Sequence, residues 1–411
     1  MIETFRLLTP SRLNWLKEAC SLHFFNLKTR HPKSETPIEL WIKKDGDLGL
    51  NAQRETGIDF IYGGNKLRKL EYILPAVIAK GAHSISTVGG EGSHHVLASI
   101  IAAKQLGLTS HVLLTPQKHS SHSQIVYRTI TRLATSVTVE EQETSHELKK
   151  QIGRWQDRIN KVHGESYFIP TGGSSILGTF GMIDAVFELV SQMEEKFGQS
   201  NSQTDLYAEK SFDDCVSSVP LETLSALYIP TASGSSLAGL LLGFALAWPK
   251  IWKVPQIYAV KVGPKQLISR KKVLKLYQGC LQKLMQTQQQ ISSFQQKQTQ
   301  CLSILRQRLH QANHHVPRFT ILGDYLGQGY AEPTDKCMAV QTWAQPYEII
   351  LDPTYTSKAF AALVDQEFPN SLSKLSLETQ THILSAPNQS KKKRILFWHT
   401  LDERPLNSLP N

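Results

Sequence analysis

Short apolar runs, each followed by a small-residue turn and a segment of helical spacing, recur along most of the chain. A clear example is Ile85 to Val88, which ends at Gly89-Gly90 and is followed by apolar positions at helical spacing from Val96 to Gly107. Apolar β-branched runs of this length favour buried strands, and a three- to four-residue spacing favours a helix. This segment therefore predicts a strand, a tight turn and a helix.

The same succession is repeated further along the chain. Strand, turn and helix in repetition are typical of an α/β protein with parallel sheets, in which ligands lie at the carboxyl ends of the strands. The apolar residues 349–351 lead into Asp352-Pro353. Further strands are predicted at 110–115, 167–170, 227–230 and 257–262, and helices at about 178–197 and after the turn at 231–236.

Two segments depart from this pattern. Residues 198–220 are polar throughout, which predicts a surface loop. Residues 270–315 are rich in Gln and in basic residues, and their apolar positions follow a three-four spacing. That spacing predicts a long helix or a helical hairpin with a polar middle, added to the rest of the fold.

The basic charge of the chain is concentrated in one window. The 45 Lys and Arg residues exceed the 35 Asp and Glu residues, for a net charge of +10. A basic excess spread over a surface would suggest nucleic acid or an anionic membrane as partner. Outside the window 265–318, which contains no Asp or Glu, 35 bases face 35 acids, so the main body is neutral and nucleic acid is not expected. The bases of the window are Lys265, Arg270, Lys271, Lys272, Lys275, Lys283, Lys297, Arg306, Arg308 and Arg318.

Cysteine usage and hydropathy narrow the class of protein. The five cysteines are scattered, and no Cys-x-x-Cys occurs, so neither a disulfide framework nor a thiolate zinc site is indicated. The first 18 residues lack an uninterrupted apolar core, so we expect no signal peptide. The longest apolar run, Leu237 to Trp248, is too short to span a bilayer. We therefore expect a cytoplasmic protein without a membrane partner.

The segment Gly63-Gly-Asn-Lys-Leu-Arg-Lys-Leu-Glu-Tyr72 is the first with candidate chemistry. Its glycines permit an unusual backbone path, and Asn65 could cap the helix that follows. Lys66 would lie in the first turn, where the helix dipole disfavours a cation and lowers the lysine pKa. A lysine with a lowered pKa suits covalent chemistry with carbonyl groups. The alternative is a solvated surface lysine.

The second and third segments are turns at helix starts. In Val88-Gly-Gly-Glu-Gly-Ser-His-His95, Ser93 could hold a substrate carboxylate, take part in proton transfer, or simply cap a helix. His94 and His95 are adjacent and would point to different faces of the helix, so no metal site is expected. Thr231-Ala-Ser-Gly-Ser-Ser236 suits a phosphate group but lacks the Walker pattern, and an ordinary strand-to-helix turn is the alternative.

In this order and at these distances, the segments resemble the fold-type II pyridoxal-phosphate enzymes, specifically the group of 1-aminocyclopropane-1-carboxylate deaminase and D-cysteine desulfhydrase. The resemblance covers nearly the whole chain, and its most specific parts are Asn-Lys-x-Arg-Lys-Leu-Glu and Asp-Pro-x-Tyr-Thr-x-Lys. The matching segments are 41–49, 64–72, 89–95, 170–178, 233–239, 329–333, 351–359 and 394–400.

The resemblance implies a fold of two three-layer αβα domains with open, mostly parallel sheets, similar to the tryptophan synthase β subunit. Residues 1–75 and 190–411 would form a large cofactor-binding domain, with a basic helical insert at about 265–318, and residues 76–189 a small domain. Pyridoxal 5'-phosphate would be the cofactor, a small amino acid the substrate, and a homodimer the assembly.

The resemblance also implies roles for individual residues. Lys66 would carry the cofactor and shuttle the substrate α-proton, while Ser93, with His94 and His95 beside it, would bind the substrate carboxylate. Tyr330 and Tyr355 would face the substrate as catalytic residues. The remaining cofactor-binding residues would be Asn65 and Lys69, the phosphate cradle Ser233, Gly234, Ser235 and Ser236, and Thr356 opposite the pyridine nitrogen.

Thr356 favours one activity over the other. A carboxylate opposite the pyridine nitrogen would keep the nitrogen protonated and make the ring a strong electron sink, and a hydroxyl does not. A weaker sink suits β-elimination, and in this family Glu at the position goes with ring-opening deaminases. We therefore expect a lyase that converts D-cysteine or a related amino acid to pyruvate, ammonia and sulfide. The alternatives are the ring-opening deaminase, which forms 2-oxobutanoate, and a non-catalytic binding protein on this fold.

Three departures from the family pattern motivate the last alternative. His94 replaces the usual Asn, Glu91-Gly92 replaces Ile-Gln, and Leu401-Asp402 replaces a pair of glycines near the cofactor.

Overall fold

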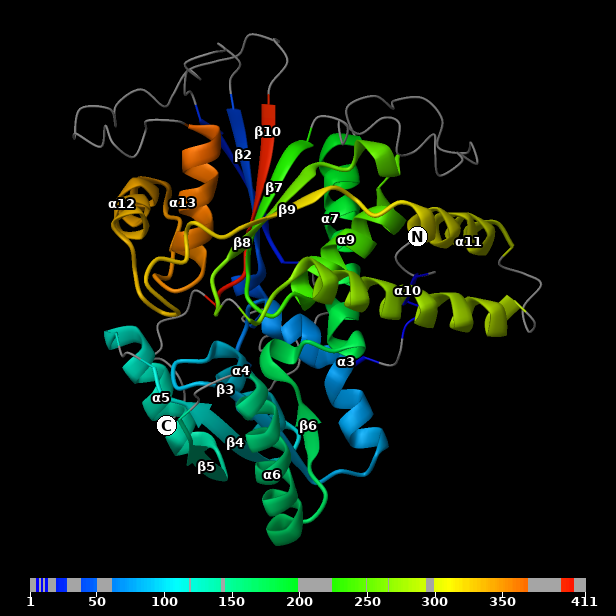
Figure 1. Cartoon of the computed structure of the whole chain (residues 1–411). Helices are drawn as coiled ribbons and strands as arrows, with labels where there is room; N and C mark the ends of the chain where they lie inside the picture. Colours follow the sequence, from blue (N-terminus) through cyan, green and yellow to red (C-terminus); the bar gives the residue numbers. More distant parts are fainter. Residues whose placement is uncertain are drawn as a thin grey trace.

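The structure is a computed structural model built around two sheets, an upper and a lower one in Figure 1. Helices cover both faces of each sheet, so that each forms a three-layer αβα unit, as predicted. The described residues are 5–6, 9, 12–13, 20–27, 38–49, 61–117, 120–141, 145–198, 224–248, 250–264, 266–292, 299–368 and 393–402.

The upper sheet has six strands in the order β1-β2-β10-β7-β8-β9. Only the β1–β2 pair is antiparallel, and every other neighbour pair is parallel. Alternate residues of β10 face opposite layers: Leu396 and Trp398 pack toward one set of helices and Ile395 and Phe397 toward the other. The strands are β1 (Leu22–Leu27), β2 (Ile38–Lys44), β7 (Leu224–Thr231), β8 (Gln256–Lys261), β9 (Phe319–Leu322) and β10 (Lys393–His399).

The lower sheet has four strands, all parallel, in the order β5-β4-β3-β6. On one of its faces lie α3, α4 and α5, and on the other lies α6. The strands predicted at 85–88, 110–115 and 167–170 are confirmed here as β3, β4 and β6. The elements are β3 (Ser84–Gly90), β4 (Thr109–Thr115), β5 (Ser136–Val139), β6 (Tyr167–Ile169), α3 (Asn65–Ala79), α4 (His94–Gln105), α5 (Ser121–Leu133) and α6 (Ser145–His163).

Helices α7 (Ile176–Gly198) and α9 (Ser235–Ala247) form the centre of the molecule. Every residue of α9 is buried, and its glycines allow α7 to approach closely. A Cβ on Gly239 would lie 2.5 Å from the Cβ of Met182, and one on Gly243 would lie 2.7 Å from that of Val186. Helix α7 is long and apolar enough to cross a membrane, but 78% of its apolar window is buried, as in a core helix.

The opposite face of the upper sheet is covered by α12 (Asp335–Ala344) and α13 (Thr356–Glu367) (Figure 1). Residues 349–351 form no strand and lead directly into the turn before α13. Four short 3-10 turns complete the described elements: Asp45–Asp47, Thr171–Gly173, Ile251–Lys253 and Gln345–Tyr347.

The basic segment forms a helical hairpin, as predicted, of α10 (Arg270–Ser292) and α11 (Thr299–His314). Its assignment as an insert in the family fold stays a prediction. Its apolar seam is part of the core formed by α7 and α9, because the three-four spacing turns these residues inward. Deleting the hairpin would expose that core. The buried residues are Val273, Tyr277, Cys280, Leu281, Leu284, Leu302, Leu305, Leu309 and Ala312.

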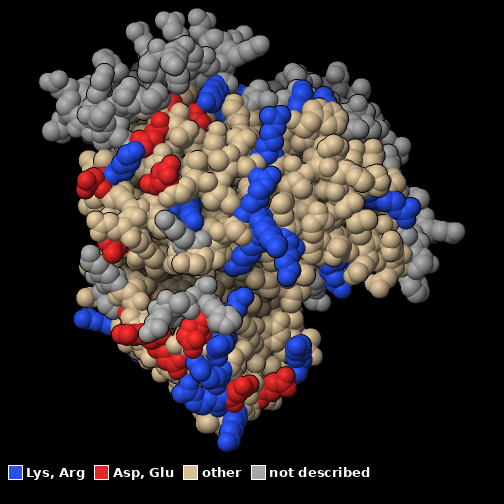
Figure 2. Space-filling view, viewed as in Figure 1, with Lys and Arg blue, Asp and Glu red and all other residues tan. Residues whose placement is uncertain are grey.

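The bases of the hairpin lie mostly on its outer side. Arg270, Lys271, Lys275 and Lys283 are exposed. In the view of Figure 2, a band of Lys and Arg side chains runs from the upper edge of the molecule down to its centre. The excess positive charge therefore lies on the solvent-facing side of the two helices, whose other side packs in the core.

The division of the chain into a large and a small domain at 75/76 and 189/190 stays a prediction. Both positions fall inside helices, α3 and α7, that continue through them. The predicted surface loop at 198–220 lies outside the described residues, apart from Gly198 at the end of α7.

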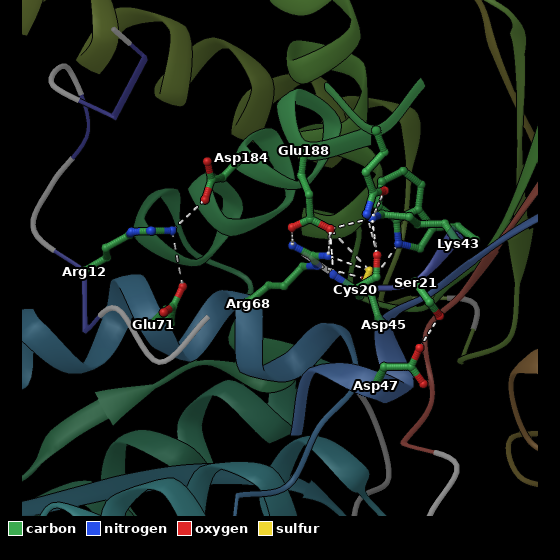
Figure 3. Close-up of polar contacts among 12 residues, drawn as sticks. Arg12, Cys20, Ser21, Lys43, Asp45, Asp47, Arg68, Glu71, Asp184 and Glu188 are labelled. Carbon is green, nitrogen blue, oxygen red and sulfur yellow. Dashed lines mark hydrogen bonds and ion pairs between the residues drawn. The ribbon is translucent and has the colours of Figure 1, made fainter. Parts of the chain in front are cut away.

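A buried ionic cluster joins α3 and α7 beneath the first turn of α3 (Figure 3). Arg68 donates to Asp45 Oδ1 over 2.8 Å and to both oxygens of Glu188 over 3.0 and 2.9 Å. Lys43 donates to the same Glu188 and, over 3.0 Å, to the Cys20 carbonyl. Burial alone would raise the pKa of Glu188, but Arg68 and Lys43 hold it well below its usual value. Each charge in this cluster is therefore satisfied by others.

Candidate active site

A cavity of about 650 Å³ opens at the carboxyl ends of β3, β4 and β7, between the two sheets. This is where the strand-turn-helix pattern placed a ligand site. The structure brings most of the predicted site residues to its wall. They are Asn65, Lys66, Lys69, Ser93, His94, His95, Ser233, Gly234, Ser236, Tyr330 and Tyr355; Ser235 and Thr356 are buried behind the wall.

The loop before Lys66 is held by close backbone packing. Gly64 has a φ of +77°, and a Cβ there would lie 2.7 Å from the Thr400 carbonyl oxygen. The predicted cap by Asn65 is wrong, because Gly64 occupies the N-cap position of α3 without a side-chain hydrogen bond. Instead, Asn65 Oδ1 accepts from Lys66 Nζ over 2.7 Å, and Nδ2 donates to Ser236 Oγ over 3.3 Å. Asn65 thus links the lysine to the turn before α9.

The pKa of Lys66 is lowered to about 8. Burial at the cavity wall is the main cause, and it is only partly opposed by the carboxylates of Asp45 and Asp352. The lowering was predicted from the helix dipole, but the structure assigns it to burial. Near neutral pH the unprotonated fraction of the amine is therefore much larger than for an ordinary lysine, and this fraction is available as a base or nucleophile.

The turn before α9 is built as an anion cradle. Gly234 adopts a φ of +92°, and the hydroxyl-bearing residues Ser235 and Ser236 begin the helix. The buried Lys69 Nζ donates to Ser235 Oγ over 2.8 Å and to the Gly172 carbonyl over 3.0 Å. Among the described residues no carboxylate pairs with Lys69, and burial and the neighbouring Lys66 lower its pKa well below the usual value.

These features fit a bound phosphate. A buried amine with only neutral oxygen partners gains from a nearby dianion, and the free amides at a helix start add to the attraction. Thr231 Oγ1 also lies at this wall, buried and without a hydrogen-bond partner in the described structure. Behind the turn, a Cβ at Gly234 would lie 3.2 Å from the Val273 side chain, so the hairpin packs against the cradle.

Ser93 caps α4 and lines the cavity at the same time. Its Oγ accepts from the Val96 amide over 3.4 Å. The two histidines after it point to different partners, as predicted: the His95 Nε2 contacts Thr87 Oγ1 at 3.1 Å, and His94 Nδ1 contacts the Tyr62 hydroxyl. In the part of the chain described here, no group of three or more His, Cys, Asp or Glu side chains could hold a metal ion.

Tyr330 and Tyr355 meet at the cavity wall, where their hydroxyls are hydrogen-bonded to each other. Burial raises the pKa of Tyr330 to about 12 and that of Tyr355 well above its usual value. Both are therefore neutral at physiological pH and act as a hydroxyl pair.

Thr356 is the first residue of α13 and is fully buried, but it does not line the cavity. Its hydroxyl donates to Asp352 Oδ2 over 2.6 Å and accepts from the Asp352 amide over 2.7 Å. The Asp352 carboxylate also accepts from the amides of Thr354 and Tyr355. The hydroxyl proton of Thr356 is thus committed to the turn that positions Tyr355.

Two wall residues, Tyr62 and Gln117, were missed by the sequence analysis. Asp402, which the sequence analysis named only as a departure from the family pattern, also lines the cavity. Asp402 Oδ2 accepts from the Gly63 amide over 2.6 Å, so the residues that replace the usual glycines help to hold the lysine loop. Tyr62 could have been found because it precedes Gly63 of the lysine loop, and Gln117 because it is a polar residue just after β4.

The buried histidines predict a stability that falls in acid. Burial is the main cause that lowers the pKa of His94 to about 3 and that of His95 well below 6.5. Below about pH 6.5 the unfolded chain binds protons that the folded chain does not, so the free energy of unfolding falls by about 1.4 kcal/mol per pH unit for each histidine. Urea unfolding at about pH 6 and about pH 5 measures this slope.

In a His94→Asn variant, the fall in the free energy of unfolding per pH unit should be smaller by about the contribution of one histidine. Replacement of the exposed His315 should leave that fall unchanged. Equal slopes in the wild type and the His94→Asn variant would contradict a neutral, buried His94.

Comparisons with known proteins agree with this site. Residues 34–376 match the model of the family described as "Pyridoxal-phosphate dependent enzyme". The chain is 26% identical to the D-cysteine desulfhydrase of Salmonella typhi over 349 residues, which cover 82% of this chain and 89% of the relative. It is also 26% identical over 340 residues to a Thermotoga maritima protein named "Putative 1-aminocyclopropane-1-carboxylate deaminase", covering 82% of this chain and 90% of that protein.

The fold agrees as well. The crystal structure of an ACC deaminase homologue superposes with a TM-score of 0.61 at 22% identity, covering 97% of this chain and 94% of that one. The fold and the lysine-and-phosphate site define a cofactor-dependent α/β enzyme. The chain belongs to the pyridoxal-phosphate dependent enzyme family, and its cofactor is pyridoxal phosphate.

Proposed function

We propose that the protein is a lyase that eliminates the β-substituent of D-cysteine, or of a related small amino acid, to give pyruvate, ammonia and sulfide. The observation that carries this proposal is the amine of Lys66, with its lowered pKa, in one cavity with Ser93 at the start of α4. A base for the α-proton and a site for the α-carboxylate are the two protein groups that such an elimination requires.

The cofactor-binding residues have distinct roles in this proposal. Pyridoxal phosphate supplies the electron sink that makes the α-proton removable. Lys69 and the Ser233–Ser236 turn hold the phosphate, Asn65 orients the amine of Lys66, and Lys66 carries the α-proton. Tyr330 and Tyr355 present their hydroxyl pair to the substrate.

Thr356 favours elimination over ring opening. Thr356, which the resemblance puts opposite the pyridine nitrogen, would present there a hydroxyl bonded to Asp352 rather than a carboxylate. The electron sink would then be weaker, which an elimination tolerates because the electron pair of the carbanion forms the new C=C bond as the leaving group departs with the C–S pair. The desulfhydrase name of one relative supports this choice.

Product identification tests the proposal. The holoenzyme should release pyruvate and sulfide from D-cysteine and no 2-oxobutanoate from 1-aminocyclopropane-1-carboxylate. Formation of 2-oxobutanoate without any sulfide would contradict the proposed lyase activity. It would instead indicate the ring-opening deaminase, the activity that a second relative's name suggests.

Gln117 is proposed as a substrate-binding residue. Both polar atoms of its amide are buried and lack a hydrogen-bond partner in the described structure, and a Cβ at Gly92 would lie 2.6 Å from Nε2. An amide left unpaired at a cavity wall gains a bond when a polar substrate enters. In a Gln117→Ala variant, steady-state kinetics should show KM raised roughly tenfold and kcat changed less.

The exposed Gln124, a few residues away on α5, provides the control, since its replacement by alanine should leave KM unchanged. An unaltered KM in the Gln117→Ala variant would remove this residue from the substrate site.

We also propose a cytoplasmic homodimer. The free cysteines Cys20, Cys280 and Cys337 are all buried in the reduced form, which is typical of a reducing compartment. The dimer rests on the family resemblance, and sedimentation of the purified protein tests it.

A further inference from the structure

A chain of three polar side chains leads from the cavity wall toward the outside of the lower αβα unit. The Tyr62 hydroxyl contacts His94 Nδ1, and His94 Nε2 lies 2.8 Å from Nε2 of His122. Tyr62 and His94 line the cavity and are buried, whereas His122, the second residue of α5, is half-buried and outside the wall. The chain therefore connects the cavity to a histidine nearer to solvent.

The hydrogen bonding of this chain allows two arrangements. A neutral imidazole has one N–H donor and one acceptor nitrogen, and both nitrogens of His94 are engaged. In one arrangement, Tyr62 donates to His94 and His94 donates to His122. In the other, His122 donates to His94 and His94 donates to Tyr62. Changing from one arrangement to the other moves a proton along the chain without leaving a charge on His94.

The surroundings keep His94 neutral. Burial, the largest cause, acts with the neighbouring His122 and Lys66 to lower its pKa to about 3, against the opposing effect of Asp352. The Tyr355 ring also lies nearly perpendicular to the His94 ring, with the ring centroids 5.8 Å apart. A histidine in this setting transmits protons more readily than it stores one.

Resting on the proposed lyase function, we propose that Tyr62, His94 and His122 form a proton relay to the sulfur that leaves the substrate. As the C–S bond breaks, the sulfur of the substrate thiolate departs with the bonding electron pair and takes the proton of the Tyr62 hydroxyl, so that hydrosulfide leaves rather than S²⁻. His94 returns a proton to Tyr62 and receives one from His122, which takes its proton from water and leaves hydroxide in the solvent. The α-proton on Lys66 follows a separate path. Tyr62 touches the leaving group, and His122 acts only through His94.

A comparison of leaving groups tests the relay in the holoenzyme. The sulfur of a substrate thiolate needs a proton as it leaves, because S²⁻ is a very strong base, whereas the chloride of β-chloro-D-alanine leaves without one. In a His122→Ala variant, kcat with D-cysteine should fall about a hundredfold, as for loss of a general acid, and kcat with β-chloro-D-alanine should stay within about twofold of the wild type. Added imidazole should restore part of the lost rate, because His122 is half-buried.

The matched control is His163→Ala, which removes one ring of a second histidine pair, stacked on His111 at 4.4 Å between the centroids. Equal losses on both substrates, or no loss on either, would overturn the relay and leave the lyase in place. A wild-type enzyme that releases no sulfide from D-cysteine would overturn the proposed function and the relay together.

Discussion

Replacing Lys66 with alanine should lower kcat by roughly a thousandfold or more. The amine of Lys66 lines the same cavity as Ser93, and its pKa of about 8 suits proton transfer near neutral pH. The variant should also lose the visible absorbance of the lysine-bound cofactor. Absorbance and pyruvate formation measure the two losses separately.

Lys104→Ala is the matched control, because Lys104 is an exposed lysine on the neighbouring helix α4. That variant should keep both the absorbance and the turnover. A Lys66→Ala variant with normal absorbance and turnover would contradict the assignment of Lys66 as the cofactor lysine.

Replacing Arg68 with methionine should lower the free energy of unfolding by about 3–5 kcal/mol. Arg68 is 2% exposed and carries the contacts to Asp45 and Glu188, so its loss leaves buried carboxylates without their main partner. Urea unfolding gives the value. Lys43 still pairs with Glu188 in the variant, so most of the lost stability comes from the Asp45 carboxylate, which is left without its arginine partner.

The exposed pair Arg158–Glu140 offers a control of the same chemistry, with an N–O distance of 3.0 Å and 60% exposure of the arginine. Arg158→Met should cost no more than about 1 kcal/mol, because water screens the pair. Similar costs for the two variants would show that the buried cluster adds no more than a surface ion pair.

The sequence was most informative where structure is local. The strand-turn-helix segments around Lys66, Ser93 and Ser233 place their residues at the carboxyl ends of strands, and the cavity lies there. Hydrophobic spacing likewise predicted both helices of the basic hairpin. Turn chemistry and periodicity act over a few residues, so one sequence is enough to read them.

Long-range contacts were out of reach. Nothing local indicates that the apolar seam of the hairpin packs on α7 and α9, or that Val273 lies behind Gly234. Likewise, His122 meets His94 only because α5 packs beside α4, and Asp402 reaches Gly63 across 339 residues of chain. The burial that lowers the pKa of Lys66 is also a tertiary property, which is why the helix dipole was credited in its place.

Release of sulfide and pyruvate from D-cysteine is the measurement that decides whether the protein is a β-eliminating lyase. We expect the holoenzyme to release the two products in equal amounts and the Lys66→Ala variant to release neither. Failure of the cofactor-loaded wild type to release sulfide from D-cysteine would contradict the proposed lyase function.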